Sequence, residues 1–368
     1  MKLIAQLKLQ PTSEQAQTLR RTLETANAAC NFISDIAWES RTFGKFALQK
    51  LCYEQVREQF DLSAQMTIRA LAKVGDAYKL AKLAKRTFRP HAAIAYDDRI
   101  LSFALPKSEV SIWTLEGRLA LPFVCGERQR RMLATRQGES DLLYHRGEWY
   151  LLVTCEIEEP NPHDVDAVLG VDLGIVHLAV DSDGETHSGQ QIEQKRQWYT
   201  KRRKALQSVG TKSAKCRLRQ LAGRQCRFQK DTNHRISKRL VAKAKRTKRA
   251  IAVEELTGIR QRVRVRGPAQ RARHSNWAFS QLRKFISYKA KQAGVLVVAV
   301  DPRNTSCTCS VCRHCEKGNR RSQAEFCCVV CGHQAPADVN AASNIRDRAD
   351  VRRPMVSSLR AEAQAQCL

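Results

Sequence analysis

The sequence contains no apolar run that approaches the length of a membrane-spanning helix. Its first ten residues, MKLIAQLKLQ, alternate between polar and apolar side chains. This alternation predicts a strand, and the stretch lacks the continuous apolar core of a secretory signal. The two absences together predict a soluble intracellular protein.

Acidic residues are also scarce, because the chain has 36 Asp and Glu against 64 Lys and Arg, a formal net charge of +28. A chain with this excess repels itself unless it binds a polyanion, and nucleic acid is the usual polyanion. An anionic membrane surface is the alternative partner, which the lack of a long apolar run disfavours. The charge therefore predicts a nucleic-acid-binding protein.

Cysteine, in contrast, is frequent, with 14 residues in a chain of 368. In a chain of this size without a secretory signal, so many cysteines favour metal ligation or reduced thiols over disulfides. The length predicts two or three domains with an ample core.

The N-terminal part, residues 1–160, reads as one strand, then helices, then several strands. Thr12 and Gln15 stand at capping-box spacing, which predicts a helix start, and residues 63–85 show a second helical pattern. From residue 93 to residue 157 the apolar residues come in short alternating runs separated by turn residues. These runs predict antiparallel hairpins that close a small barrel or sandwich. No chemical motif occurs here, which favours a scaffold or docking role.

The second half alternates strands and helices, as in an α/β domain. Three carboxylates hold similar positions in it: Asp172 follows an apolar strand, Glu254 ends the strand RAIAVE, and Asp338 begins a helix after a loop. Each has a simpler explanation when taken alone. Asp172 could form a turn beside Gly174, Glu254 could be a solvated strand end, and Asp338 could be a helix N-terminal acid.

Taken together, the three carboxylates predict a shared metal site, because each lies where a strand or helix ends at a common edge. Burying a carboxylate is costly unless a cation or hydrogen-bond donor accompanies it. Hard cations such as Mg²⁺ or Mn²⁺ choose carboxylate ligands, and two ions about 3.5–4 Å apart need several of them. We expect Asp172 to bridge two ions, with Glu254 and Asp338 completing their shells.

A cysteine-rich insert at residues 305–332 predicts a structural zinc site. Two C-x2-C pairs are separated by fifteen residues, a spacing typical of a tetrahedral four-thiolate site. The predicted ligands are Cys309, Cys312, Cys328 and Cys331. Other registers use Cys307, Cys315 or Cys327, and His333 could replace a thiolate. The stated four are preferred because the two pairs have equal spacing and Gly332 supplies a knuckle turn.

A long basic helical stretch at residues 195–249 contains a single acid, Asp231. A solvated helix face normally mixes charges of both signs, so this stretch predicts phosphate binding. Its aromatic residues Trp198, Tyr199 and Phe228 are interpreted as core contacts. The basic residues expected to bind nucleic acid are Lys201, Arg202, Arg203, Lys204, Arg217, Arg219, Lys238 and Arg239. A second basic stretch, at residues 260–274, is the alternative location.

Several segments together resemble the TnpB family of transposon-encoded RNA-guided DNA endonucleases, which are relatives of the type V CRISPR effectors. They are GVDLGI, IAVEEL, DPRNTSCTCSVC with FCCVVCGH, and ADVNAASNI. The N-terminal LQPTSEQAQTLRRTLETANAACNF and the segments NWAFSQLRKFISYKAKQAGV and NRRSQAEFCC also resemble that family, so the similarity extends over nearly the whole chain. Two residues depart from the pattern: Cys307 replaces a polar residue, and Arg313 replaces a glycine.

The resemblance implies an N-terminal β-barrel with a helical recognition insert at residues 1–160. It also implies a RuvC-like nuclease domain of the RNase H fold at residues 161–304 and 333–350, a zinc ribbon at 305–332 and a flexible tail at 351–368. By motif, Asp172, Glu254 and Asp338 match the catalytic acids, and the four cysteines match the ribbon ligands.

The function implied by the resemblance is metal-dependent cleavage of double-stranded DNA, directed by a guide RNA transcribed from the transposon end. The target would carry an adjacent motif, and the protein would lie in the prokaryotic cytoplasm with the nucleoid. Two alternatives remain open. One is an RNA-guided repressor that does not cut, and the other is a guide-independent transposase or resolvase of the same fold.

Overall fold

The computed structural model describes residues 1–80, 82–165, 167–174, 177–187, 190–255 and 279–349. The chain divides after Glu158 into two compact units. Within the described ranges, no helix is both long and apolar enough to span a membrane. The predicted tail at residues 351–368 and the basic stretch at residues 260–274 lie outside the described residues.

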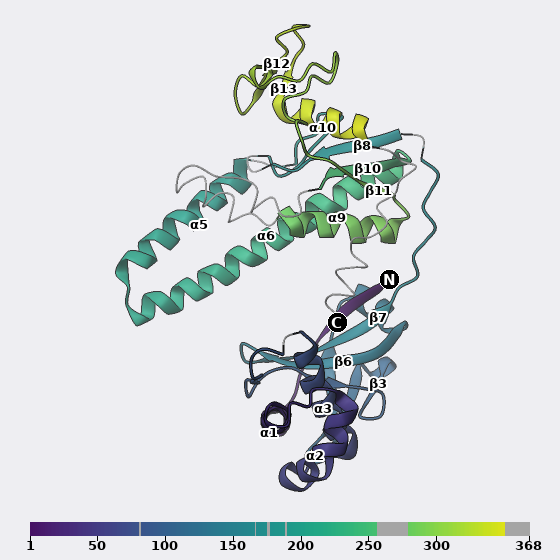
Figure 1. Cartoon of the computed structure of the whole chain (residues 1–368), viewed down its shortest axis with the longest axis vertical. Coiled ribbons are helices and arrows are strands. Elements are labelled where there is room, and N and C mark those ends of the chain that lie inside the picture. Colours follow the sequence, from purple (N-terminus) through teal and green to yellow (C-terminus); the bar gives the residue numbers. More distant parts are fainter. Residues whose placement is uncertain (81, 166, 175–176, 188–189, 256–278, 350–368) are drawn as a thin grey trace. The chain divides into compact units, whose positions relative to one another are not determined.

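The first unit is built around a seven-stranded antiparallel sheet with the strand order β2-β6-β7-β1-β5-β4-β3 (Figure 1). The end strands β2 and β3 are joined by residues 97–100 alone, so the sheet curls back and nearly closes. The hairpins predicted between residues 93 and 157 are confirmed as β3–β4, β4–β5 and β6–β7. The strands are β1 Lys2–Leu9, β2 Ile94–Tyr96, β3 Leu101–Ala104, β4 Glu109–Thr114, β5 Gly117–Val124, β6 Arg136–His145 and β7 Glu148–Glu156.

The N-terminal strand β1 lies inside this sheet because its alternation gives it one buried face. Ala5, Leu7 and Leu9 are almost fully buried, while the polar residues between them are exposed. β1 pairs with β7 in a register that places Leu7 opposite Leu151. The strand predicted from MKLIAQLKLQ is therefore confirmed, and it is a central strand.

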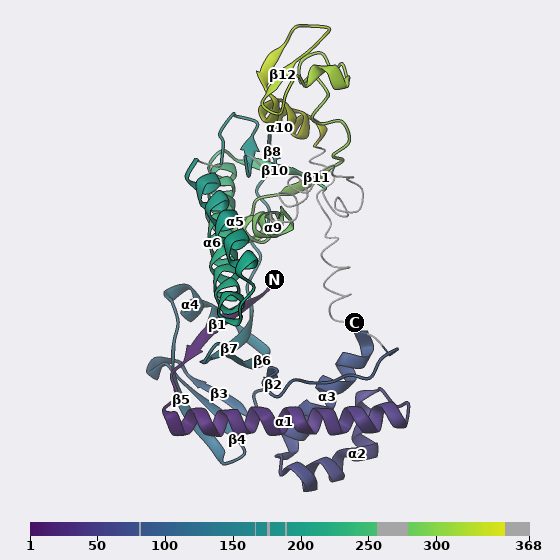
Figure 2. The ribbon, with the colours of Figure 1, turned by 90° about the vertical axis from the view of Figure 1, so that its left-hand side faces the viewer.

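Three helices pack with this sheet into one core: α1 Ser13–Glu39, α2 Lys45–Phe60 and α3 Ala64–Leu80. The predicted capping box is present, since the Gln15 N–H donates to Thr12 Oγ1 and the Thr12 N–H donates to Gln15 Oε1. Figure 2 shows α1 extended along the helical layer, with α2 and α3 beside it. Two helices were not predicted, namely α2 and the short α4 Glu127–Leu133. α2 buries only Leu48, Cys52 and Val56, a stripe one residue wide.

The second unit contains a four-stranded sheet with the order β11-β10-β8-β9. Its strands are β8 Ala167–Asp172, β9 Val180–Asp181, β10 Arg249–Glu254 and β11 Val297–Val300. β10 runs parallel to β8 and β11, whereas β9 is antiparallel to β8. Alternate side chains point to opposite faces, so Leu169 and Val171 join the core under the long helices. Gly170 faces the other way, against a C-terminal helix.

The predicted single basic helical stretch is two helices, α5 Gln190–Val209 and α6 Lys212–Arg246, which form a hairpin (Figures 1 and 2). The chain turns at Gly210, whose φ of 66° lies in the left-handed region that glycine tolerates best. Thr211 then caps α6 by accepting from the Ala214 N–H. The local sequence VGTKSA therefore ends one helix and starts the next.

Helices cover both faces of the four-stranded sheet. α6 and α9 Phe279–Ala293 pack on one face, and α10 Ala337–Arg348 packs on the other (Figure 1). The approach of α10 is close, because a Cβ atom on Gly170 would lie 2.0 Å from the Ala342 carbonyl oxygen. This contact gives the first glycine of GVDLGI a packing role.

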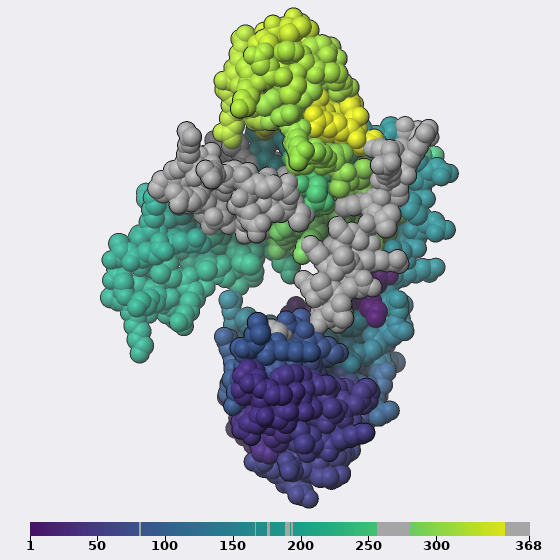
Figure 3. Space-filling model, viewed as in Figure 1, coloured from purple at the N-terminus to yellow at the C-terminus, as the bar shows by residue number. Residues whose placement is uncertain are grey.

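The cysteine-rich insert, residues 305–332, is a small lobe of the second unit (Figure 3). It contains the 3₁₀ turn η2 Lys317–Asn319 and strand β12 Glu325–Cys327, which pairs with β13 Gln334–Pro336. Its small core includes Cys309, Phe326 and Cys328, together with Ala337 of α10. The lobe is therefore packed directly on the helix that carries Asp338.

Candidate functional site

Asp172 and Glu254 lie at the ends of neighbouring parallel strands. Val253 of β10 pairs with Val171 of β8, so the residue after each, Glu254 and Asp172, reaches the same edge of the sheet. Both side chains point away from the α6 and α9 core, because their neighbours Val171 and Val253 point into it. The prediction that these two carboxylates meet at one sheet edge therefore agrees with the strand register.

Asp172 is the most electrostatically perturbed carboxyl group of this edge. Burial raises its pKa from 3.8 to about 8, with further increases from the negative charges of Glu254 and Asp338. The positive charge of Arg320 opposes this increase. The side chains of Asp172, Glu254 and Asp338 are thus close enough to repel one another, and a cation would relieve that repulsion.

Glu254 is 9% exposed, and its burial raises its pKa. Its Oε1 atom accepts a hydrogen bond of 2.5 Å from Thr305 Oγ1, the first residue of the cysteine-rich insert. The neighbouring residue, Glu255, points elsewhere and forms a two-pronged pair with Arg283 of α9. The two adjacent glutamates therefore have different partners, and Glu254 is the one that faces Asp172.

Asp338 lies in the first turn of α10, where its side chain is 19% exposed. Arg320 Nη2 lies 3.4 Å from Asp338 Oδ1. Because Arg320 also acts on Asp172, this arginine stands beside two of the three carboxylates. Thr305 and Arg320 were not predicted as site residues, since neither type in isolation indicates a site.

Two asparagines of α10 hold the start of the insert in place. Asn340 Nδ2 donates to the Thr308 carbonyl at 2.8 Å, and Asn344 Nδ2 donates to the Thr305 and Thr308 carbonyls at 2.9 and 2.6 Å. Both asparagine side chains are buried. The insert, α10 and the Thr305–Glu254 hydrogen bond consequently form one connected network.

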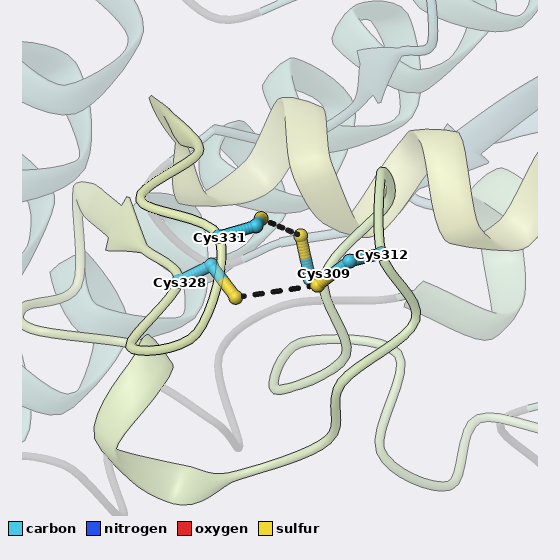
Figure 4. A group of neighbouring side chains, drawn as sticks. All are labelled: Cys309, Cys312, Cys328 and Cys331. Carbon is cyan, nitrogen blue, oxygen red and sulfur yellow. Dashed lines mark hydrogen bonds between the residues drawn. The ribbon is translucent and has the colours of Figure 1, made fainter.

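The insert brings the four predicted zinc ligands together (Figure 4). Cys309 Sγ lies 3.7 Å from Cys331 Sγ, and Cys312 Sγ lies 3.5 Å from Cys328 Sγ. Disulfide sulfurs would be about 2.05 Å apart, whereas two thiolates on one zinc ion, each at about 2.3 Å, lie roughly 3.8 Å apart. The spacing therefore fits a four-coordinate zinc ion. The alternative thiols Cys307, Cys315 and Cys327 are not part of this four-sulfur group.

The knuckle of the second pair favours a thiolate. The backbone N–H groups of Cys331 and Val330 lower the pKa of Cys328 to about 6. The His333 backbone N–H also lowers the pKa of Cys331, but hydrogen bonds with the other thiols raise it by more. The backbone N–H groups of the knuckle therefore favour the thiolate form of Cys328.

Arg313, which departs from the pattern of the family that the sequence resembles, has a backbone conformation that favours glycine. Its φ is 66°, in the left-handed region where glycine is favoured. Its side chain donates to Asp347 Oδ2 of α10 at 2.8 Å. The other departure, Cys307, is half-buried beside Ser306. The knuckle is formed despite both changes.

The predicted basic residues lie on the α5–α6 hairpin, and all of them except Arg203 are exposed. Arg203 is half-buried and its guanidinium donates to Gln225 Oε1 of α6. The prediction that the aromatic residues are core contacts holds for Tyr199, which is 5% exposed. It is wrong for Trp198, which is 50% exposed. Trp198 lies on the outer side of α5, with its ring 5.1 Å from the Tyr199 ring.

Comparison with known proteins matches two segments of the chain, which lie mostly in the second unit, to protein families. Residues 152–259 match a family described as probable transposase (OrfB_IS605), and residues 279–345 match the Cas12f1-like TNB domain. The CRISPR-associated endodeoxyribonuclease Cas12f1 of Sulfoacidibacillus thermotolerans is 32% identical over 54% of this chain and 50% of its own length. A TnpB-like protein of Methanocaldococcus jannaschii is 28% identical over 53% of this chain and 74% of its own length.

Two further comparisons extend the likeness. The putative RNA-guided DNA endonuclease InsQ of Escherichia coli is 29% identical over 54% of this chain and 53% of its own length. The aligned region covers half or less of the full length of the first two Cas12f1 relatives. A solved Cas12f1–sgRNA–target DNA complex shares the fold, with a TM-score of 0.64 and 17% identity over 91% of this chain and 83% of that one. The predicted resemblance is thereby confirmed: the chain is similar to TnpB and Cas12f1 proteins, and its match to a probable-transposase family is followed by a match to the Cas12f1-like TNB domain.

Proposed function

We propose that this protein is a transposon-encoded, RNA-guided DNA endonuclease. The observation that carries the proposal is the carboxyl edge of the four-stranded sheet, where burial and the charges of Glu254 and Asp338 raise the pKa of Asp172 to about 8. Groups with pKa values shifted this far are common at functional sites. The names of TnpB, Cas12f1 and InsQ relatives supply the reaction class.

We assign the second unit to the RuvC-like nuclease fold, with the insert as a zinc ribbon. Its order of strands, with a parallel β11-β10-β8 arrangement and an antiparallel β9, supports this assignment. The three carboxylates are an oxygen-only donor set that suits Mg²⁺ or Mn²⁺. Two ions bound there would supply Lewis-acid activation of water and of the departing 3′ oxygen.

The protein side chains have separate roles in this proposal. Asp172 faces both other carboxylates, so Asp172, Glu254 and Asp338 would together hold the metal. Thr305 fixes the Glu254 carboxylate through its 2.5 Å hydrogen bond. Arg320 partly neutralises Asp338 and Asp172, which limits the repulsion among the acids.

The guide RNA and its DNA target are the proposed partners of the basic hairpin. The exposed residues Lys201, Arg202, Arg217 and Arg219 present positive charge along α5 and α6. Such side chains recognise the phosphate backbone, while base pairing with the guide reads the sequence. A guided binder that does not cut remains the second candidate function, but it would not need three carboxylates at one edge.

The deciding experiment is to purify the chain with its RNA, sequence that RNA, and incubate the complex with DNA complementary to it. We expect a discrete RNA and Mg²⁺-dependent cleavage. Asp172→Ala should abolish cleavage and keep RNA and target binding, while the exposed Asp76→Ala in the first unit should cleave normally. Cleavage by Asp172→Ala at the wild-type rate would contradict the site assignment. If no discrete RNA were bound, the proposal that a guide RNA directs cleavage would be wrong.

A further inference from the structure

A second group of metal-ligating side chains lies in the same unit as the carboxylate edge but on the opposite face of the sheet. It consists of Asp181, Glu185 and His187, whose ligand atoms all lie within 4.8 Å of one another. Asp181 pairs with Val171 across the β8–β9 ladder, whereas Asp172 pairs with Val180. Since paired residues share a face, Asp181 points towards α6 and Asp172 points towards α10.

Asp181 is a fully buried carboxylate with one oxygen already committed. Its Oδ1 accepts the backbone N–H groups of Asp183 and Glu185 at 3.1 and 3.0 Å, which fixes its orientation. Its Oδ2 is directed at Lys243 Nζ of α6, 2.5 Å away. The fold therefore presents one oxygen of a rigid carboxylate to a position that already attracts a cation.

His187 supplies the independent observation. Its side chain is 2% exposed, and its buried Nε2 atom has no hydrogen-bond partner among the described residues. Leaving such an atom without a partner costs roughly 1–3 kcal/mol. Nε2 lies 3.9 Å from Asp181 Oδ2, too far for a hydrogen bond. Two ligand atoms at about 2.0–2.2 Å from one tetrahedral ion lie roughly 3.3–3.6 Å apart, so a small approach of the two side chains would let both bind one ion.

Lys243 competes for this position, but it has another partner. Its Nζ lies 3.0 Å from Asp183 Oδ2, and Asp183 also pairs with Arg249. Three carboxylates, at positions 181, 183 and 185, face these two cations, and Arg239 adds a further positive charge near His187. Lys243 can therefore stay on Asp183 while a divalent ion takes its place beside Asp181.

We propose that Asp181, Glu185 and His187 form a binding site for a divalent transition-metal ion. Asp181 Oδ2, one Glu185 oxygen and His187 Nε2 are the ligands, and Lys243 is displaced towards Asp183. One imidazole with two carboxylates suits Zn²⁺ or Mn²⁺ better than Mg²⁺, which takes oxygen ligands almost exclusively. The ion would tie β9 to the turn that follows it, because all three ligands come from residues 181–187.

The test compares bound zinc per chain, by elemental analysis, after dialysis of the full chain against buffered Zn²⁺. All proteins carry the Asp172→Ala change, so that the carboxylate edge holds no metal. The parent should bind one zinc more than its His187→Gln and Glu185→Gln variants. The exposed His145→Gln on β6 is the matched control and should equal the parent. Equal zinc in the parent and in both ligand variants would overturn the proposal.

Lys243→Met separates a metal site from a simple ion-pair network. It leaves the buried Asp181 without its ammonium partner, so its thermal midpoint should fall in zinc-free buffer in either case. If the site binds metal, added Zn²⁺ should restore the thermal midpoint. The site in Lys243→Met should also be half occupied at a free zinc concentration about tenfold lower than in the parent. Adding His187→Gln should remove the rescue. A midpoint that does not respond to zinc in Lys243→Met would contradict the site even if a ligand variant failed to fold.

Discussion

The negative charge that Asp172 gains on ionisation is only partly balanced by the protein, through Arg320. Its pKa of about 8 means that, without metal, the group is largely protonated at neutral pH. A folded-state pKa raised above the unfolded value contributes stability that is fully present below pH 3.8 and is lost progressively as the pH rises from there to about 8. Metal binding must displace the proton below that pH, so the affinity for Mg²⁺ should increase with pH up to about 8.

Asp172→Asn should therefore stabilise the metal-free protein at high pH. The amide keeps the shape of the side chain but never ionises, so the thermal midpoint in magnesium-free buffer should exceed that of the parent by a margin that grows from about pH 4 to pH 8, and should approach it only near the unfolded pKa of 3.8. The expected gain is a few degrees, because about 1 kcal/mol corresponds to roughly 2–4 °C in a domain of this size. A midpoint lower than the parent's at pH 9 would show that the carboxylate is not strained.

Arg320 is predicted to set the pH dependence of the site. Its charge lowers the pKa of Asp172, so Arg320→Ala should shift the rise in Mg²⁺-dependent cleavage to higher pH. Arg320→Lys should reverse part of the shift, because it keeps the charge. The neighbouring Arg321 is exposed, and Arg321→Ala should leave the profile in place. A loss of rate that is equal at every pH would instead indicate a structural role for Arg320.

At the scale of elements, the contact between β8 and α10 places Asp338 opposite Asp172. A Cβ on Gly170 would lie 2.0 Å from the Ala342 carbonyl and 2.6 Å from the Arg346 nitrogen, both backbone atoms. Gly170→Ala must push α10 away and should destabilise the second unit by about 3 kcal/mol. Gly44→Ala, whose Cβ would meet nothing closer than 4.0 Å, is the control. Unfolding midpoints in urea measure both.

Most elements with a strong period could be predicted from the sequence, and weakly patterned ones could not. The alternating strands and the capped helix α1 were predicted because each buries one regular face. α2 was missed because its buried stripe is narrow, and the α5–α6 turn was missed because Gly210 is a single residue within a uniformly basic run. The carboxylates could be located by motif. Thr305 and Arg320 could not, since their contacts depend on how the insert folds onto α10.

The α5–α6 hairpin is expected to contribute phosphate contacts. The helix α5 exposes Lys201, Arg202 and Lys204. Replacing all three by alanine should weaken RNA binding, and the slope of log affinity against log salt concentration should become shallower by about one unit per lost contact. Arg203 is left unchanged because it bonds to Gln225 inside the hairpin. Binding is measured across a salt series. A triple alanine variant of the exposed Lys50, Arg57 and Lys107 in the first unit controls for net charge, and an unchanged slope in the hairpin variant would favour a merely solvated face.

At the scale of the whole chain, the ribbon and the carboxylate edge depend on each other. The insert supplies Thr305 to Glu254 and Arg320 to Asp338, while Asn340, Asn344 and Asp347 of α10 hold the insert. In a lobe with so small a core, a zinc ion held by the four cysteines would supply much of the folding free energy. Loss of zinc should therefore disturb a site whose ligands do not include any cysteine.

Cys328→Ser tests this dependence. After dialysis against zinc-free buffer, the parent should retain one tightly bound zinc, and the variant should retain none, because serine cannot replace the thiolate that the knuckle amides favour. Cleavage should fall strongly while the first unit keeps its unfolding transition, since the two units have separate cores. Cys315→Ser removes an exposed thiol of the same lobe that lies outside the four-sulfur group, so it should keep both zinc and activity. If Cys315→Ser lost the zinc and Cys328→Ser kept it, a ligand set that includes Cys315 would be correct. If Cys328→Ser lost the zinc and still cleaved normally, the carboxylate edge would not depend on the zinc site.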